Sequence, residues 1–227
     1  MFEQRKYHRP FLGIFSKILG QQDRHDGAIA DSIKYLAALQ ADSIDAWQEA
    51  EWRHTLTGFN PPSIDQMAAH WMSIRQGKEI PYRTALDVAA IPQALPNIWL
   101  AERLSDGEFI YRVAGEEITK ALGPIHRGSL ARDLFTEEAY ERIARRWNFV
   151  LDSPSALRSG GEAVLGSGQT VPLQRLILPL ACEESGPCYL LGATGYSQPR
   201  FNVETVSEFP PTDVLFTRVE NIQTYRE

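Results

Sequence analysis

The chain has 227 residues, of which 43% are hydrophobic, so it is long enough to bury a sizeable core. Its 29 acidic side chains outnumber its 23 basic ones, which gives a net charge of -6 at pH 7. This charge opposes attraction to a phosphate backbone, so we expect no nucleic acid among the partners.

The first apolar stretch, residues 11–19, is too short to span a membrane. It follows Arg5, Lys6 and Arg9, as the apolar region of a signal peptide would, but no small-residue cleavage site comes directly after it. We expect this stretch to dock on its own domain or on a partner, and membrane contact is the less favoured alternative. The chain is therefore predicted to be cytoplasmic.

A helical pattern covers residues 29–47, where apolar side chains recur at steps of three and four. The members of this stripe are Ile29, Ile33, Leu36, Ile44 and Trp47, with Gln40 as a polar member. Such a stripe is either an internal packing contact or the seam of a homodimer. We predict an N-terminal helical extension over residues 1–62. Its candidate interaction residues are Ile33, Leu36, Ile44 and Trp47.

Two adjacent prolines, Pro61 and Pro62, end this extension, because proline lacks an amide donor and disfavours a helix before it. Ser63 and Gln66 then form a capping-box pattern that predicts the start of a new helix. Gly77 suits the C-terminal end of that helix. The predicted folded domain therefore begins at residue 63.

Alternating apolar patterns and turn signals predict five strands and two helices after this helix. Their expected ranges are strands 98–104 and 108–113, helices 115–122 and 136–151, and strands 157–165, 171–180 and 188–195. Asp106 and Gly107 form a hairpin signal between the first two strands. Residues 197–227 are predicted to be a C-terminal tail that either adds a strand or is disordered.

Cys182 and Cys188 are expected to be reduced thiols, since a lone pair without a secretory signal is seldom a disulfide. A hairpin could bring them together, so a disulfide is the alternative. The pair lacks the further ligands of a structural zinc site, and we expect no metal.

Five short motifs occur in an order that is typical of one protein family. They are His70-Trp71-x-x-Ile74-Arg75-x-Gly77, the Pro81 stretch, Ile91-Pro92-x-x-Leu95-Pro96, Phe109-x-Tyr111-Arg112-x-x-Gly115 and Arg175-Leu176-x-Leu178-Pro179-Leu180. Residues 63–196 thereby resemble a family of bacterial proteins that carry a single divergent PAS domain. The resemblance implies an α+β domain used for sensing or protein association. We see no kinase, cyclase or helix-turn-helix output module, so the domain is expected to act through another chain.

From this order we predict a PAS-like five-stranded antiparallel sheet with helices on one side. A concave sheet roofed by helices is the usual setting for a small apolar ligand. Alternation places Phe109, Tyr111 and Val113 inward, opposite the leucines of residues 176–180. The candidate ligand-binding residues are Trp99, Phe109, Tyr111, Leu122, Phe135, Trp147, Leu176 and Leu178. For each of them taken singly, ordinary core packing is the favoured alternative.

Signatures of common cofactors and reactions do not occur in the sequence. The predicted long helix contains no histidine to hold haem, and neither cysteine lies in the setting that flavin-binding PAS domains use. No serine lies in a Gly-x-Ser-x-Gly elbow, and no glycine-rich stretch carries the lysine of a P-loop. We therefore expect no cofactor and no enzyme activity.

One basic cluster lies inside the predicted domain. Arg142 and Arg146 are four residues apart on one helix face, so they suit an acidic partner or a phosphate-bearing ligand. Pairing of Arg142 with Glu138 is the slightly favoured alternative. We predict a regulatory homodimer that binds a small apolar ligand and signals to a partner protein. A ligand-free scaffold that acts through its helices is the alternative.

Overall fold

The computed structural model describes residues 47–164, 170–183, 186–196 and 214–223. All of them belong to one of the two compact units of the chain, residues 41–227. The predictions for residues 11–19 and for Ile33, Leu36 and Ile44 lie outside the described residues.

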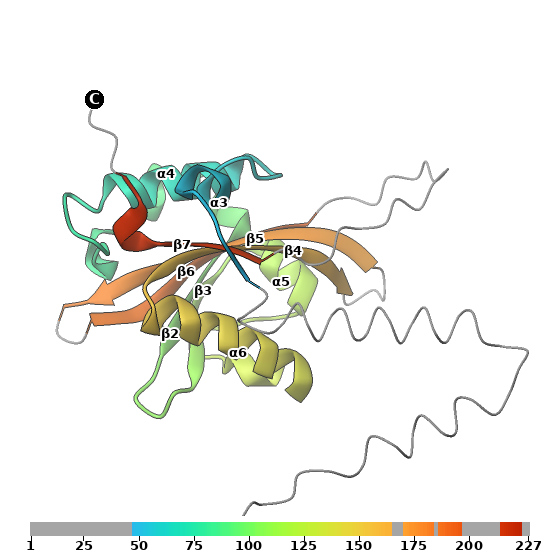
Figure 1. The fold of residues 1–227 in the computed structure, drawn as a ribbon. Helices are drawn as coiled ribbons and strands as arrows, with labels where there is room; N and C mark the ends of the chain where they lie inside the picture. The colour runs from blue at the N-terminus through green and yellow to red at the C-terminus, as the bar shows by residue number, and fades with distance from the viewer. Residues whose placement is uncertain (1–46, 165–169, 184–185, 197–213, 224–227) are drawn as a thin grey trace, which may run out of the picture. The chain divides into compact units, whose positions relative to one another are not determined.

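The described residues form a sheet with helices on both of its faces (Figure 1). The strands are β1 (Gln48–Glu49), β2 (Ile98–Arg103), β3 (Phe109–Ala114), β4 (Ser155–Val164), β5 (Thr170–Cys182), β6 (Gly186–Tyr196) and β7 (Val214–Arg218). The α-helices are α3 (Trp52–Leu56), α4 (Ser63–Ser73), α5 (Glu116–Leu122) and α6 (Glu137–Asp152). The 3-10 turns are η2 (Arg83–Ala85), η3 (Val88–Ala90), η4 (Leu95–Asn97), η5 (Ala131–Leu134) and η6 (Val219–Asn221).

The sheet has seven strands in the order β1-β7-β4-β5-β6-β2-β3. All neighbouring strands are antiparallel except β1 and β7, which pair in parallel. The five predicted strands are all present, but the predicted number of five is wrong. β1 is only two residues long, too short to show a pattern, and β7 lies in the predicted tail. Of the two alternatives for that tail, an added strand is the one seen at Val214–Arg218.

The helices cover both faces of the sheet, so the prediction of helices on one side is wrong. Figure 1 shows α3 and α4 on one side of the sheet and α6 on the other. The core on the first side, here called the α4-side core, includes Leu56, Ile64, Met67, Trp71, Leu176, Leu178, Leu180 and Leu191. The core on the second side, here called the α6-side core, includes Trp99, Phe109, Tyr111, Ile118, Trp147, Leu157, Ile177 and Leu190. Both faces of the central strands are apolar, and each face needs its own cover.

The start of α4 differs in detail from the predicted capping box. Ser63 is the first helical residue rather than the cap, and its hydroxyl donates to Asn97 Oδ1 at 3.4 Å. The carboxylate of Asp65 instead accepts the amides of Gly58 and Phe59, at 3.2 and 3.1 Å. Asp65 thereby ties the preceding loop to the first turn of α4. The predicted start of a helix at residue 136 is confirmed, since Thr136 caps α6 and its Oγ1 accepts the amide of Ala139 at 3.4 Å.

Candidate functional site beneath α6

Trp147 of α6 lies at the centre of a cluster of aromatic rings between that helix and the sheet. Its ring stacks on Trp99 of β2 with centroids 5.1 Å apart and an interplanar angle of 30°. Phe109 and Tyr111 of β3 contact it edge-on, at 5.0 and 6.0 Å. These rings occupy the space in which the sequence predicted a ligand.

Trp99 reaches this position because β6 has a glycine beneath it. A Cβ added at Gly192 would overlap the indole ring of Trp99. The ring is then fixed by a hydrogen bond from Trp99 Nε1 to Thr194 Oγ1 at 3.2 Å. The indole ring of Trp99 therefore packs directly on β6 and fills the side of the site next to the sheet.

A cavity of about 10 Å³ remains beside these rings. This volume matches about one water molecule, whereas sites for small organic ligands have roughly 300–1,000 Å³. Among its lining residues are five of the predicted ligand-binding residues: Trp99, Tyr111, Leu122, Phe135 and Trp147. A sixth, Phe109, packs on Trp147 within the same core.

The other two predicted ligand-binding residues, Leu176 and Leu178, lie on the opposite face of the sheet. Both belong to the α4-side core, and their neighbour Ile177 faces α6 instead. The prediction that they face Phe109 and Tyr111 is therefore wrong. β5 is apolar on both faces, so its sequence shows no alternation from which the inward face can be identified.

Val113 also departs from the predicted inward face, because a β-bulge interrupts β3. Tyr111 pairs with Ala101 whereas Val113 pairs with Leu100, which leaves Arg112 as an extra residue. The extra residue turns Val113 away from α6, and its side chain is 43% exposed. A bulge of this kind has no clear signal in the sequence.

The site contains three polar residues that sequence reasoning missed: Arg175, Thr194 and Tyr196. Arg175 of β5 lies opposite Thr194 of β6, and its Nε donates to Thr194 Oγ1 at 3.0 Å. The sequence did contain one sign of this polar site, because Arg175 is a charged residue within the mostly apolar sequence of β5.

Both tyrosines at the site are held in the neutral form. Burial raises the pKa of Tyr111 above its ordinary value, and the positive charge of Arg175 opposes this only in part. Burial also raises the pKa of Tyr196, with the same opposing charge. Both side chains therefore keep their phenolic protons at neutral pH and can donate hydrogen bonds.

A second hollow lies on the other side of the sheet, between α3 and α4. It is an open groove of about 570 Å³, with Trp52, Leu56, Ala68 and Met72 among its lining residues. None of the predicted ligand-binding residues lines this groove.

The predicted interaction residues within the described ranges make contacts inside the domain. Trp47 is 6% exposed and packs edge-on against Phe149 of α6, with centroids 5.0 Å apart. This is the internal-packing alternative for that residue. Arg142 lies 3.3 Å from Glu138 in an ion pair within α6, which is the slightly favoured alternative, and Arg146 lies one turn further along the helix.

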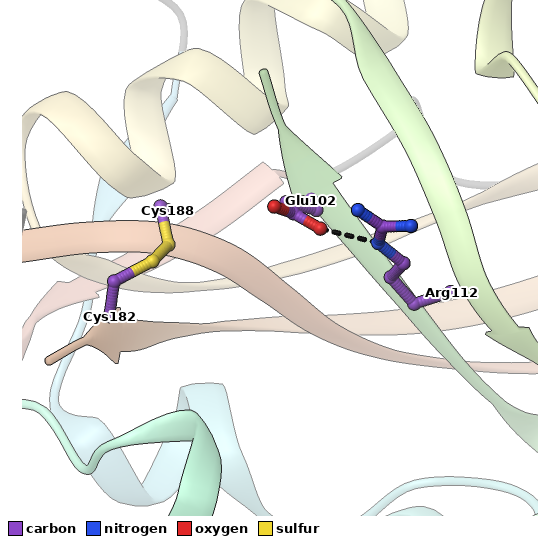
Figure 2. The surroundings of a disulfide bond; sticks show 4 residues. All are labelled: Glu102, Arg112, Cys182 and Cys188. Atoms are coloured by element: carbon purple, nitrogen blue, oxygen red, sulfur yellow. Dashed lines mark hydrogen bonds and ion pairs between the residues drawn. A yellow bond between two sulfur atoms is a disulfide. The ribbon is translucent and has the colours of Figure 1, made fainter. Parts of the chain in front are cut away.

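Cys182 and Cys188 form a disulfide at the end of the β5–β6 hairpin, so the prediction of reduced thiols is wrong (Figure 2). Leu180 pairs with Tyr189 and Ala181 pairs with Pro187, so Cys188 is the extra residue of a bulge. Figure 2 shows the nearby ion pair between Glu102 and Arg112 of strands β2 and β3. The hairpin places the two cysteine Cα atoms 6.0 Å apart, within the usual range for a disulfide.

Two further findings concern only the residues that the structure describes. No group of three or more His, Cys, Asp or Glu side chains is placed there to hold a metal ion. No helix in these ranges has the length and apolar character needed to cross a membrane.

The sequence matches the PAS domain family over residues 59–194, which is more than half of the chain. The chain therefore belongs to the PAS domain family. The domain boundaries predicted at residues 63 and 196 stay predictions. A comparison with curated proteins gives no match.

The solved structures that match this chain include light-oxygen-voltage (LOV) receptors. An RsLOV variant is 15% identical, with 47% of this chain and 61% of that chain covered and a TM-score of 0.35. The chain thus spans less than two thirds of that protein. The Aureochrome1 LOV domain is 15% identical, with 49% and 89% covered and a TM-score of 0.33.

VqmA of Vibrio cholerae, in a complex with a ligand and DNA, is 12% identical. The match covers 55% of this chain and 62% of that chain, with a TM-score of 0.37. At such identities and TM-scores, these matches say nothing about a ligand, a nucleic acid or a partner of this chain.

Proposed function

We propose that this chain is a regulatory PAS domain that acts through contacts with another protein and fills its interior with its own aromatic side chains. The observation that supports this proposal is the packing of Trp147 against Trp99, Phe109 and Tyr111, with a cavity of only about 10 Å³ beside them. The apolar organic ligand that the sequence predicted would need a far larger space. The ligand-free alternative is therefore the one that the geometry favours.

A regulatory domain of this kind passes on a change of state rather than a chemical product. A partner can shift such a state only by binding one conformation better than another. In this proposal the partner contacts the N-terminal segment, whose candidate residues Ile33, Leu36 and Ile44 also join two copies of the chain. The domain has no enzyme activity of its own.

The proposal of a cytoplasmic location has one observation against it. Lasting disulfides are rare where thioredoxin and glutathione keep thiols reduced, and Cys182 and Cys188 are joined. Mass spectrometry of alkylated protein from cells would show which form exists there.

Native mass spectrometry of the gently purified full chain tests the main proposal. We expect a dimer with no organic molecule retained. The double change Ile33→Glu and Ile44→Glu should give monomer, while Ala38→Glu, which lies off the apolar stripe by helical period, should leave the dimer intact. An apolar molecule retained at one per chain would overturn the filled-interior proposal, and a double variant of unchanged mass would overturn the role of the stripe.

A further inference from the structure

The indole N–H of Trp147 has no hydrogen-bond partner although the residue is only 2% exposed. A buried N–H group that has lost water and gained no acceptor is costly, so such groups are rare in folded proteins. Trp147 lines the cavity of about 10 Å³ beneath α6. This cavity is the space beside Trp147 that has room for an acceptor.

Arg175 lines the same cavity and brings a positive charge to it. Its Nε donates to Thr194 Oγ1 at 3.0 Å, and that oxygen already accepts from Trp99 Nε1 at 3.2 Å. Within the described residues, no hydrogen bond or ion pair engages the two Nη groups of Arg175. The Nη groups of Arg175 are therefore available to donate hydrogen bonds to a ligand.

The cavity is lined by side chains that can donate hydrogen bonds, and no negatively charged side chain is among the described residues that line it. Glu117 acts electrostatically on Tyr196 of the lining, and it is itself paired with Lys120 at 2.9 Å. Ser159, directly opposite Arg175 in β4, has a buried hydroxyl that also lacks a partner, but it does not line the cavity.

We propose that this cavity binds one small anion, held between the guanidinium of Arg175 and the indole N–H of Trp147. An anion accepts hydrogen bonds from every side, and the guanidinium and the indole N–H, unlike the hydroxyl groups of the lining, can only donate. Charge-assisted hydrogen bonds to Arg175 would further favour the anion. The volume limits the occupant to about the size of a halide ion. The proposed anion site is independent of the proposed function. An interior that contains no organic ligand is compatible both with a bound ion and with its absence.

Thermal unfolding of the full chain in sodium chloride, compared with sodium gluconate at equal ionic strength, tests this site. A ligand that binds only the folded state raises the Tm as its concentration rises. We expect chloride to raise the Tm above the gluconate value with a saturable dose response. If the Tm depends on ionic strength alone, the cavity holds water and the proposal fails.

Two pairs of variants assign the effect to these residues. Arg175→Met should abolish the chloride response, whereas Arg145→Met, at an exposed arginine of α6, should keep it. Trp147→Phe should raise the half-saturating chloride concentration about tenfold, the usual loss for one hydrogen bond to a charged group. Trp71→Phe, which removes an indole N–H from the α4-side core, should leave that concentration unchanged. A chloride response that is unchanged in either Arg175→Met or Trp147→Phe would overturn the proposal.

Broadening of the chloride-35 NMR signal by the native protein gives a direct readout that does not depend on unfolding. Bromide should reverse this broadening by competition. Benzoate exceeds the cavity and should not compete. If benzoate competes as well as bromide does, α6 opens to admit an organic carboxylate, and the proposal of a small ion is overturned.

Discussion

The two cores of this domain differ in how completely their polar groups are paired. On the α4 side, Trp71 Nε1 donates to the carbonyl of Pro179 at 2.8 Å. The buried guanidinium of Arg75 donates to three carbonyl groups, at 2.9 to 3.1 Å. On the α6 side, Trp147 Nε1 and Ser159 Oγ are buried without partners.

This difference indicates that the α4 side of the sheet is structural, whereas the α6 side is the candidate functional face. Buried polar groups that are fully paired make a core unique and stable, as on the α4 side. Buried polar groups without a partner are rare in native structures, and each needs an explanation such as a bound ion, a water molecule or a functional role. Both sides are apolar and well packed, so hydrophobicity alone does not distinguish them.

The variant with the largest expected effect tests whether the packing of Trp99 on β6 depends on Gly192. Gly192→Ala would place a methyl group against the ring of Trp99, and overpacking of this kind should destabilise the fold by about 3 kcal/mol. Urea unfolding would measure the loss. Gly160→Ala is the matched control, because the nearest heavy atom to the added Cβ is Leu173 O at 3.8 Å. Equal stability of the two variants would contradict the close fit of Trp99 on β6.

A pair of tryptophan changes sharpens the comparison between the cores. Trp71→Phe removes a hydrogen bond, whereas Trp147→Phe removes a donor that has no partner. Both lose a similar ring volume, so we expect Trp71→Phe to cost about 2 kcal/mol more in urea unfolding without chloride. If Trp147→Phe were the costlier change, its indole N–H would have an acceptor in solution, and the contrast between the cores would disappear.

Local turn and cap chemistry made parts of this fold predictable from the sequence. The Asp106-Gly107 signal gives the β2–β3 hairpin, where Gly107 takes a positive φ of 87° and Asp106 Oδ1 accepts the amide of Glu108 at 3.0 Å. Thr136 likewise marks the start of α6. These features depend on neighbouring residues alone, so a short stretch of sequence contains the information.

The site was harder to predict because it depends on strands that are distant in sequence. The inward face of β5 is set by its pairing with β4 and β6, and its run Leu176-Ile177-Leu178 is apolar on both faces. The contact between Trp99 and Gly192 requires the register of β2 on β6. Arg175 and Thr194 likewise meet only through register. The sequence pointed to aromatic residues that gather beneath α6, but not to the polar residues around them.

Removal of the disulfide tests the hairpin that supports both cores, since β5 and β6 contribute side chains to each. The double change Cys182→Ser and Cys188→Ser opens a loop with a sequence separation of 6. The chain-entropy argument gives a loss of about 2 kcal/mol for a loop of this size. Native protein in dithiothreitol should show the same loss, and the double variant should not respond to the reductant. A native protein that is insensitive to dithiothreitol would contradict a bond that stabilises the fold.

The smallest expected effect is the part that Tyr111 of the α6 side plays in the loss of stability at high pH. Burial raises the pKa of Tyr111 in the folded state, so the unfolded chain releases this proton first. The stabilising contribution is therefore complete below the unfolded pKa of about 10 and is lost as the pH rises above that value, by at most about 1.4 kcal/mol per pH unit. Tyr111→Phe should reduce the slope of unfolding free energy between about pH 10 and 11, whereas Tyr82→Phe, at a tyrosine outside both cores, should not. An unchanged slope in Tyr111→Phe would mean that solvent reaches this phenol, which a closed α6-side core does not permit.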